Sequence, residues 1–292
     1  MPELPEVEVV RGGLIPAVTG ATVRNVEVLD ERSLRRHPGP SEDFVERLTG
    51  AVLAAPSRRG KYLWMPLAGA DEALVVHLGM SGQVLLREPA AERQKLTRIV
   101  LDLHQPAFGE VRVDFVDQRI FGSMAIDALV PTLDVPGERI PASVAHIARD
   151  PLDPHFDDAL FFARLHRRRT TIKRALLDQT LISGIGNIYA DEALWASRIH
   201  YDQPTDALSR PKMRTLLAEV RAVLQKALAE GGTSFDAQYV NVNGASGYFS
   251  HSLNAYGQHG TPCARCGTPI VREVFMNRGS HFCPRCQRIR VR

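Results

Sequence analysis

The chain has 292 residues, of which 44% are hydrophobic and 24% are charged. This length favours two domains, and the composition is ordinary for a globular protein with substantial buried cores. No apolar run approaches the ~20 residues of a membrane-spanning helix. The opening MPELPEVEVV also lacks the basic-then-apolar order of a secretory signal. We therefore expect a cytoplasmic protein with no membrane partner.

The formal net charge of +3 conceals a difference between the two halves of the chain. Residues 1–150 carry 17 Lys and Arg against 21 Asp and Glu, whereas residues 151–292 carry 19 against 12. Such an asymmetry is a weak indication of a polyanionic partner.

The first half of the sequence is typical of β structure. A short helix over about 5–14, ended by Gly12-Gly13, is expected first. Short segments rich in β-branched residues and separated by turn residues follow at 22–29, 61–67, 73–78, 83–87, 98–103 and 111–116. Their close spacing without intervening helices predicts an antiparallel sandwich or barrel.

The second half has helical periodicity. Residues 131–154 contain five prolines, which indicates a linker, and the predicted helices cover about 157–165, 171–181, 188–197 and 212–230. Residues 233–258 lack a clear period and are rich in Gly, Asn and Ser, so a long loop is expected there. We predict an α+β protein. Its expected parts are a β-sandwich domain (1–135), a linker (136–154), a helical domain (155–232), a loop and connection (233–258) and a zinc finger (259–292).

All four cysteines lie near the C-terminus, in the pattern Cys263-x2-Cys266-x16-Cys283-x2-Cys286. Two CxxC pairs at this spacing are typical of a tetrahedral zinc site. Two disulfides are the alternative, which a cytosolic chain disfavours. Four thiolates leave no open coordination position, so the expected single Zn²⁺ is structural.

Two stretches of the second half are strongly basic. Residues 263–292 hold seven arginines and one acid, and residues 164–174 read RLHRRRTTIKR. A basic zinc hairpin suits contact with phosphates, although a solvated basic tail has the same composition. The turn from Gly184 to Asn187 predicts a helix N-terminus that could bind an anion, or a simple helical hairpin.

The N-terminus itself could carry chemistry. Removal of Met1 would make Pro2 a secondary amine next to a helix N-terminus, where the dipole disfavours its protonated form. Such an amine can form a Schiff base with a carbonyl carbon, and Glu3 and Glu6 could serve as acid or base beside it. Taken alone, the same residues also form an ordinary helix start.

Five motifs together resemble the formamidopyrimidine-DNA glycosylase / endonuclease VIII family. They occur in the family's order and span nearly the whole chain: PELPEVE (2–8), HLGMSG (77–82), DQRIFG (117–122), GIGNIY (184–189) and the cysteine hairpin. The Leu-Pro form of the opening motif resembles the formamidopyrimidine branch. The resemblance implies a helix–two-turns–helix motif in the helical domain.

By resemblance, Pro2 is the nucleophile that attacks C1′ of a damaged nucleotide, and Glu3 is the acid that protonates the opening sugar. Glu6 orders the site, and Lys173 lies near the lesion in a supporting role. Lys61 matches a lysine near the lesion phosphate, and we count it among the catalytic residues.

The resemblance also implies residues that contact DNA. The phosphate contacts match His77, Asn187, Tyr256 and Arg278, and Arg278 is counted among the catalytic residues as well. The wedge that fills the gap left by the everted base matches Met80, Arg119 and Phe121. Residues 233–250 match the loop that closes over that base. Ile120 stands where some relatives have Arg.

The implied activity is that of a bifunctional DNA glycosylase and AP lyase. The enzyme would remove 8-oxoguanine and formamidopyrimidines from double-stranded DNA through a Schiff base and cleave the strand by β,δ-elimination. It would act as a monomer without a nucleotide cofactor. Two alternatives stay open: an endonuclease VIII-like enzyme for oxidised pyrimidines, and a non-catalytic DNA-binding zinc protein.

Overall fold

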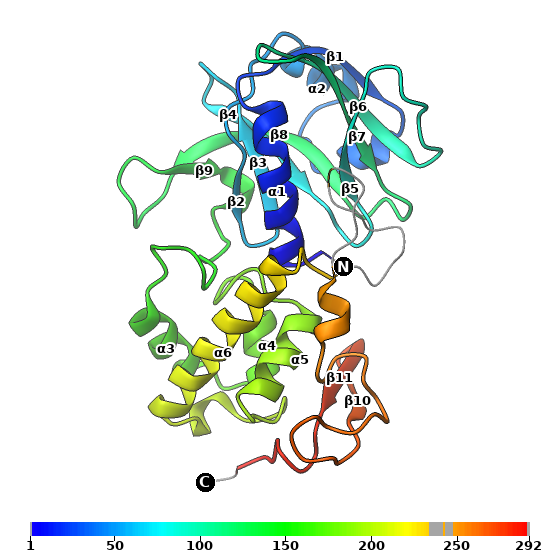
Figure 1. Cartoon of the computed structure of the whole chain (residues 1–292). Coiled ribbons are helices and arrows are strands. Elements are labelled where there is room, and N and C mark those ends of the chain that lie inside the picture. Colours follow the sequence, from blue (N-terminus) through cyan, green and yellow to red (C-terminus); the bar gives the residue numbers. More distant parts are fainter. Residues whose placement is uncertain (1, 234–241, 243–247, 291–292) are drawn as a thin grey trace. The chain divides into compact units, whose positions relative to one another are not determined.

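The computed structural model describes residues 2–233, 242 and 248–290. The chain divides into two compact units, which are described separately below (Figure 1). The first unit contains residues 1–146 and 231–247, and the second contains residues 147–230 and 248–292. None of the helices in the described ranges combines the length and apolar character that crossing a membrane requires.

The first unit is built from two antiparallel sheets. One has the strand order β1-β6-β7-β5 and the other β2-β3-β4-β8-β9. The strands of the first sheet are β1 (Thr22–Val28), β6 (Thr97–Gln105), β7 (Gly109–Val116) and β5 (Gln83–Arg87). Those of the second are β2 (Ser57–Arg59), β3 (Tyr62–Pro66), β4 (Glu72–His77), β8 (Ser123–Pro131) and β9 (Arg139–Pro141). The predicted antiparallel β-sandwich is confirmed.

A single apolar core joins the two sheets to the leading helix, α1 (Leu4–Val18). Val10 and Leu14 of α1 are buried in this core. They share it with Leu74 of the second sheet, and with Leu101 and Phe115 of the first. Successive side chains of a strand point to opposite faces, so each strand contributes one of its two faces to this core.

Helix α1 is longer than predicted, because Gly12-Gly13 does not end it. The helix continues to Val18, and Gly20, with φ of 78°, follows it. A Cβ atom at Gly13 would lie 2.3 Å from Cγ2 of Val242, so this glycine allows close packing of another segment. Glycine inside a helix costs about 1 kcal/mol relative to alanine, and here the close contact explains its presence.

One α-helix and three strands of the first unit were not predicted: α2 (Ser41–Leu48), β2, β8 and β9. Strand β8 pairs with β4 along all of β4, although its sequence SMAIDALVP has little β-branched character. Residues 136–154, predicted as a linker, contain β9 and a 3-10 helix, η2 (Ala142–Val144). The division between the two units falls within this stretch, after His146.

The second unit is helical, as predicted. Its helices are α3 (Asp158–Arg167), α4 (Ile172–Leu177), α5 (Asn187–Ala196), α6 (Arg210–Ala229), and the 3-10 helices η3 (Thr205–Ala207) and η4 (Phe249–Ser252). Helix α4 ends earlier than predicted, because the carboxylate of Asp178 accepts hydrogen bonds from the backbone and hydroxyl of Thr180 and forms a turn. A hairpin of β10 (Val271–Phe275) and β11 (Arg278–Phe282) completes the unit.

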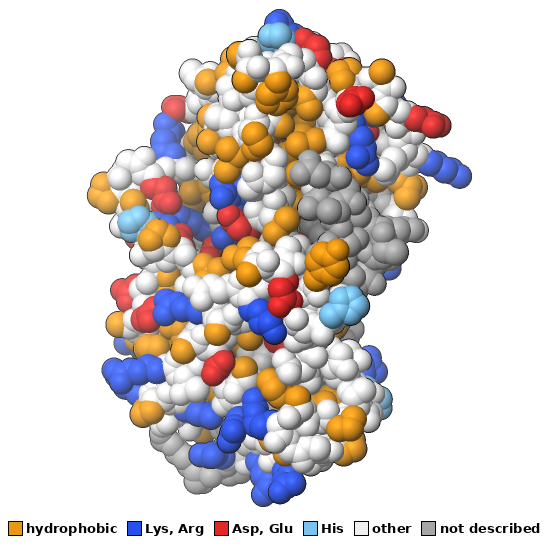
Figure 2. All heavy atoms as spheres, in the orientation of Figure 1, with side chains coloured by type: hydrophobic (Ala, Val, Ile, Leu, Met, Phe, Trp, Pro, Cys, Tyr) orange, Lys and Arg blue, Asp and Glu red, His pale blue; other side chains and the backbone are white. Residues whose placement is uncertain are grey.

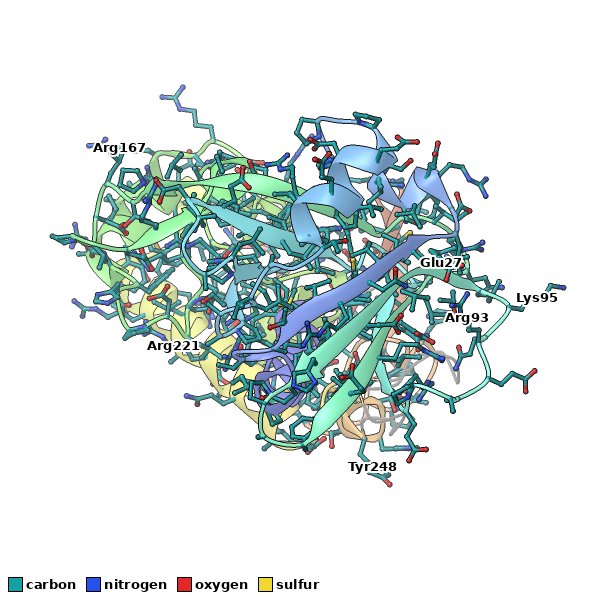
Figure 3. All side chains as sticks on the ribbon, turned by 90° about the horizontal axis from the view of Figure 1, so that it is seen from above. Glu27, Arg93, Lys95, Arg167, Arg221 and Tyr248 are labelled. Carbon is teal, nitrogen blue, oxygen red and sulfur yellow. The ribbon has the colours of Figure 1, made fainter. Side chains whose placement is uncertain are left out.

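Contacts between helices and hairpin explain how the second unit is held together. Arg221 of α6 donates two hydrogen bonds to the Asp158 carboxylate of α3, at 3.0 and 2.6 Å. Strand β11 packs on α5. In Figure 3, Arg167 of the basic stretch 164–174 extends away from the ribbon, and this side chain is exposed.

Candidate functional site

The first turn of α1 brings the N-terminal carboxylates into the interior. Pro2, Glu3 and Glu6 are all buried. Glu6 Oε2 accepts a hydrogen bond from the backbone N–H of Glu3 at 2.8 Å, as in a capping box. Glu6 Oε1 accepts from both the N–H and the hydroxyl of Thr233, at 2.8 and 2.9 Å. Glu6 therefore ties the start of α1 to the segment after α6.

The connection to Thr233 depends on two glycines. Gly231 and Gly232 have φ of 76° and 83°, values that favour glycine, and they follow the end of α6. A Cβ atom at Gly232 would lie 3.1 Å from Glu6 Oε1. Most of the predicted loop 233–250 lies outside the described residues. Within it, the carbonyl oxygen of Val242 accepts a hydrogen bond from the N–H of Leu86 in β5, 2.9 Å away.

A cluster of cations surrounds His77, which ends β4. Lys61 lies in the tight β2–β3 turn, and Tyr62 pairs with His77 across β3 and β4. Burial, together with the charges of Arg36, Lys61 and Arg35, lowers the pKa of His77 to about 4. The imidazole is therefore neutral near pH 7.

The tautomer of His77 follows from its hydrogen bond. The N–H of Gly79 donates to His77 Nδ1 at 3.1 Å, so Nδ1 carries no proton. The proton of the neutral ring is then on Nε2, which can donate a hydrogen bond to an anion. Lys61 and His77, each predicted to lie near a DNA phosphate, thus belong to one cluster, and Arg35 and Arg36 in the same cluster were not predicted.

The predicted wedge residues lie on two adjoining loops, 77–82 and 117–122. Met80 and Phe121 are 45% and 47% exposed, unusually high values for such large apolar side chains. A Cβ atom at Gly79 would lie 2.3 Å from the Phe121 carbonyl carbon, so the two backbones touch there. The loops therefore present Met80, Arg119 and Phe121 from one joined structure.

Asp117 joins these loops. It is fully buried, and its Oδ1 accepts hydrogen bonds from the hydroxyl of Ser81 (2.6 Å) and the N–H of Arg119 (3.1 Å). Its Oδ2 accepts from the N–H of Gly122 at 2.7 Å. Asp117 and Ser81 were missed from the sequence, although an Asp two residues before Arg119 is the pattern of an Asx turn.

The backbone between the wedge residues is strained. Ile120 has φ of 55°, in the left-handed region that a β-branched residue rarely adopts and that costs about 1–2 kcal/mol. The guanidinium of Arg35 donates hydrogen bonds to the carbonyl oxygens of Ile120 and Phe121. Arg98 Nε donates to the carbonyl oxygen of Asp117 at 2.9 Å. These contacts hold the loop in its strained conformation.

In the second unit, Asn187 begins α5 after the turn at Gly184, whose φ is 87°. Its Nδ2 donates to the carbonyl oxygen of Gly279 at 3.1 Å. Its Oδ1 is buried without a hydrogen-bond partner among the described residues. Gln179 organises the turn by accepting from the N–H of Gly184 and donating to the carbonyl of Ile185.

Lys173 is completely buried and reaches the zinc hairpin. Its Nζ lies 2.6 Å from Asp191 Oδ1 and 2.7 Å from the hydroxyl of Ser280. Asp191 Oδ2 accepts from the N–H of His281 at 2.8 Å. Lys173 and Asp191 therefore fasten β11 to α4 and α5, a linkage that sequence reasoning did not predict.

Tyr256 is held by a buried carboxylate. Glu192 Oε1 accepts hydrogen bonds from the N–H groups of Ala255 and Tyr256, both at 2.8 Å, and Oε2 accepts from that of Asn254 at 3.0 Å. Burial raises the pKa of Glu192, while these backbone donors oppose the rise. The Tyr256 ring packs edge-on against His281 of β11, with ring centroids 4.9 Å apart.

Arg278 opens β11 directly after the two-residue turn of the hairpin, where Met276 has φ of 54°. Its neighbour Gly279 is the residue whose carbonyl accepts from both Asn187 and Lys173. The predicted residues Lys173, Asn187 and Arg278 are thus assembled around one short stretch of β11. On the face shown in Figure 2, Lys and Arg gather at the lower end of this unit, whereas acidic side chains accompany them in the first unit.

The four cysteines form one metal site. Their sulfur atoms all lie within 4.8 Å of one another, which fits a tetrahedron with Zn–S distances of about 2.3 Å. Trp195 Nε1 of α5 donates to Cys263 Sγ at 3.4 Å. The Arg265 guanidinium stacks on that indole, 4.1 Å from its centroid. The site holds one structural Zn²⁺, as predicted, and connects the hairpin to α5.

Three family models match the chain in sequence order. The Formamidopyrimidine-DNA glycosylase N-terminal domain matches residues 1–124, and the Formamidopyrimidine-DNA glycosylase H2TH domain matches residues 147–238. The zinc finger found in FPG and IleRS matches residues 260–289. The matches include both ends of the chain and the helix–two-turns–helix region.

Similar proteins agree with these matches. A formamidopyrimidine-DNA glycosylase of Leifsonia xyli is 66% identical over 99% of this chain and 100% of its own length. One of Thermobifida fusca is 58% identical over 98% of this chain and 97% of its own length.

Solved structures of the Lactococcus lactis Fpg are also similar. Its complex with abasic-site DNA has a TM-score of 0.82 and 31% identity, and covers 98% of this chain and 99% of that one. A mutant of the same protein in complex with Fapy-dG DNA has a TM-score of 0.83 and 32% identity, with the same coverage. On its sequence and its fold, this chain belongs to the formamidopyrimidine-DNA glycosylase family.

Proposed function

We propose that this protein is a base-excision DNA glycosylase and AP lyase that acts on oxidised purines in double-stranded DNA. Membership of the family supports the reaction class. The observation that carries the proposal to this chain is the buried arrangement of Pro2, Glu3 and Glu6 at the start of α1. The L. lactis Fpg, which has been solved with abasic-site DNA and, as a mutant, with Fapy-dG DNA, supports the substrate class.

Pro2 is the nucleophile in this proposal. Once Met1 is removed, its secondary amine lies at the positive end of the α1 dipole, which favours the unprotonated form. The nitrogen attacks C1′, the damaged base leaves, and Glu3 protonates the sugar oxygen as the ring opens. The resulting iminium acidifies the C2′ protons, so the 3′ and then the 5′ phosphate can be eliminated.

Glu6 and the grouped cations have positioning and binding roles. Glu6 fixes the backbone of Glu3 through the 2.8 Å hydrogen bond, and so fixes the first turn from which Pro2 projects. Lys61 and the Nε2–H of neutral His77 bind backbone phosphates, and Asn187, Tyr256 and Arg278 bind phosphates from the second unit. Lys173 supports this second group from inside, because its Nζ contacts β11 beside Arg278.

The two loops that carry Met80, Arg119 and Phe121 form the wedge. A base that is everted leaves a hole in the stack, and exposed apolar side chains can fill it at a cost of a few kcal/mol for unstacking. Arg119, on the same loop as Phe121, contacts the base opposite the lesion. Action on chromosomal DNA would place the enzyme in the bacterial cytoplasm.

Borohydride trapping tests the chemistry. Incubation of the wild-type protein with an 8-oxoguanine·C duplex and borohydride should give a covalent adduct, and its mass should assign the link to Pro2. Pro2→Gly should keep duplex binding but lose cleavage by about two orders of magnitude or more. Pro16→Ala is the matched control, because Pro16 lies exposed on the same helix.

The outcome of trapping separates the alternatives. Absence of an adduct with the demethionylated wild type would support the non-catalytic DNA-binding zinc protein instead. Oxidised pyrimidines are a second candidate substrate, because the L. lactis protein has also been solved with oxidised-pyrimidine DNA. Faster cleavage of thymine-glycol than of 8-oxoguanine duplexes would favour this endonuclease VIII-like activity.

A further inference from the structure

We infer that Arg35 is a positioning residue for the wedge: it sets the position of Phe121 and Arg119 by holding the carbonyls of Ile120 and Phe121, and so controls insertion of the wedge beside a partner base. This inference rests on the proposed function. Its support is the contact between two segments about 85 residues apart in sequence. Each segment is also held by hydrogen bonds of its own in the first unit.

The first of these segments places Arg35 firmly. Arg35 follows a 3-10 helix, η1 (Glu31–Leu34), whose Ser33 and Leu34 are buried. Asp30 caps η1 by accepting from the N–H of Arg32. On the other side, His37 accepts from the N–H of Ile126 in β8 and contacts Asp43 at 2.9 Å. The backbone that carries Arg35 is therefore anchored at both ends.

The second segment is the wedge loop, residues 117–122. Asp117 holds its two ends through the N–H groups of Arg119 and Gly122, but these contacts leave the carbonyls of Ile120 and Phe121 for another donor. Both carbonyls accept from the same guanidinium, through Nη1 and Nη2 of Arg35. The planar fork of an arginine can bind two consecutive carbonyls at once, which an ammonium group cannot do with the same geometry.

The position of these contacts gives them a functional consequence. Ile120 is the residue with φ of 55°, and a loop released from Arg35 would relax toward ordinary φ values. That relaxation would turn Arg119 and Phe121, the residues on either side. Arg35 is exposed and takes part in no ion pair in the described part of the chain, so the two carbonyls are its principal partners.

The test is a comparison of Arg35→Ala with Arg32→Ala in the full-length protein. Arg32 is an exposed arginine of η1 whose guanidinium pairs with Asp30, so its loss changes the net charge equally without touching the wedge. Single-turnover cleavage of an 8-oxoguanine·C duplex should fall about 10- to 100-fold in Arg35→Ala, the scale expected for misplaced groups, and should stay within about twofold of wild type in Arg32→Ala. The cleavage rate of Arg35→Lys should lie between those of the wild type and Arg35→Ala, because an ammonium group cannot bind both carbonyls with the same geometry.

Two further measurements show whether Arg35 acts through the wedge. Borohydride trapping on a single-stranded abasic oligonucleotide needs no wedge, so Arg35→Ala should trap at the wild-type rate there. In a double-mutant cycle, Arg35→Ala should cost less in the Phe121→Ala background than in the wild type, because the part of its effect that acts through Phe121 is already lost. The ratio of rates opposite C and opposite A should also fall toward one in Arg35→Ala.

Three results would each overturn the inference about Arg35. Equal duplex cleavage by wild type and Arg35→Ala overturns the inference, and so does full additivity with Phe121→Ala. An equal loss on single-stranded and duplex DNA also overturns it, because Arg35 would then contact phosphate or support the whole site. Failure of the wild type to trap on the abasic oligonucleotide would instead contradict the proposed function.

Discussion

The two units fix their functional side chains by different interactions. In the first unit, the wedge loops are held by hydrogen bonds between backbone groups and a few buried or anchored side chains, chiefly Asp117 and Arg35. In the second, the hairpin that carries Arg278 is held by four thiolates and by the buried pair of Lys173 and Asp191. The first arrangement needs only the polypeptide, whereas the second depends on a metal and on a buried charge pair. The units should therefore respond differently to the same treatments.

Removal of zinc should have the largest effect, and only on the second unit. Zinc binding by such thiolate sites contributes on the order of 10 kcal/mol or more to folding. A strong chelator should therefore abolish amide hydrogen-exchange protection in β10 and β11 while β6 and β7 stay protected. Cys266→Ser should reproduce this pattern without chelator. If the hairpin kept its hydrogen-exchange protection after complete metal loss, the second unit would not depend on zinc in the way proposed.

Loss of the buried charge pair should be the next largest effect. Lys173→Met leaves the buried Asp191 with His281 as its one remaining ion-pair partner among the described residues. Breaking a buried pair typically costs about 3–5 kcal/mol, so we expect a loss of unfolding free energy on this scale in urea. Lys226→Met is the matched control. Its Nζ lies 3.9 Å from Glu230 at the surface, so we expect a change below about 0.5 kcal/mol. Similar values for the two variants would refute the structural role of Lys173.

Acid should weaken the first unit through His77. The pKa of His77 is about 4 in the folded chain and about 6.5 when unfolded, so the unfolded state binds a proton first as pH falls. The contribution of neutral His77 to the free energy of unfolding is complete above about pH 6.5. It is lost as the pH falls from there to about 4, and the loss is at most about 3 kcal/mol. The free energy of unfolding, measured between about pH 4 and 6.5, should fall less steeply with decreasing pH in His77→Gln than in the wild type. An NMR titration midpoint near the unfolded value in the folded protein would count against this account.

Loss of the Asp117 carboxylate should have the smallest of these effects on stability. Asp117→Ala leaves the buried N–H of Gly122 without its acceptor, and we expect a cost of about 2 kcal/mol in chemical denaturation. Asp127→Ala, which removes one hydrogen bond to Ser143 near the surface, should cost less than half as much. A cost for Asp117→Ala no larger than this control would mean that Asp117 does not organise the wedge loops.

Much of the architecture could be predicted from local patterns. Short segments rich in β-branched residues identified most of the long strands, because such side chains suit a buried pleated surface. The CxxC pairs identified the metal site because their spacing brings four sulfurs together. Strand β8 was missed, because its alanines carry no strand signal and its pairing with β4 supplies the stability instead. Helix α1 was predicted too short, because the packing of Val242 against Gly13 cannot be inferred from neighbours in sequence.

The residues of the candidate site were proposed mainly by resemblance, and the supporting residues needed coordinates. Arg35 meets Ile120 across 85 positions, and Glu192 meets Tyr256 across 64. No local period or spacing encodes such pairs. The single-residue assignments of Pro2, Glu3 and Lys61 stay predictions, and the charge asymmetry between the halves did not reveal the cations grouped at His77 in the acidic half.

The way the wedge loop is anchored bears on how its specificity could be redesigned. The anchors described above use the carbonyls of residues 117, 120 and 121, the N–H groups of residues 119 and 122, and one carboxylate. The side chains at 119–121 are not among them. The backbone of the wedge loop should therefore tolerate substitution of these three side chains. In a combinatorial library at positions 119–121, we expect the loop to keep its backbone conformation while its preference for the opposite base changes. Glycine and asparagine adopt a positive φ at a lower cost than isoleucine does, so either residue at position 120 would relieve the backbone strain. The most stable members of such a library should therefore be enriched in these two residues at that position.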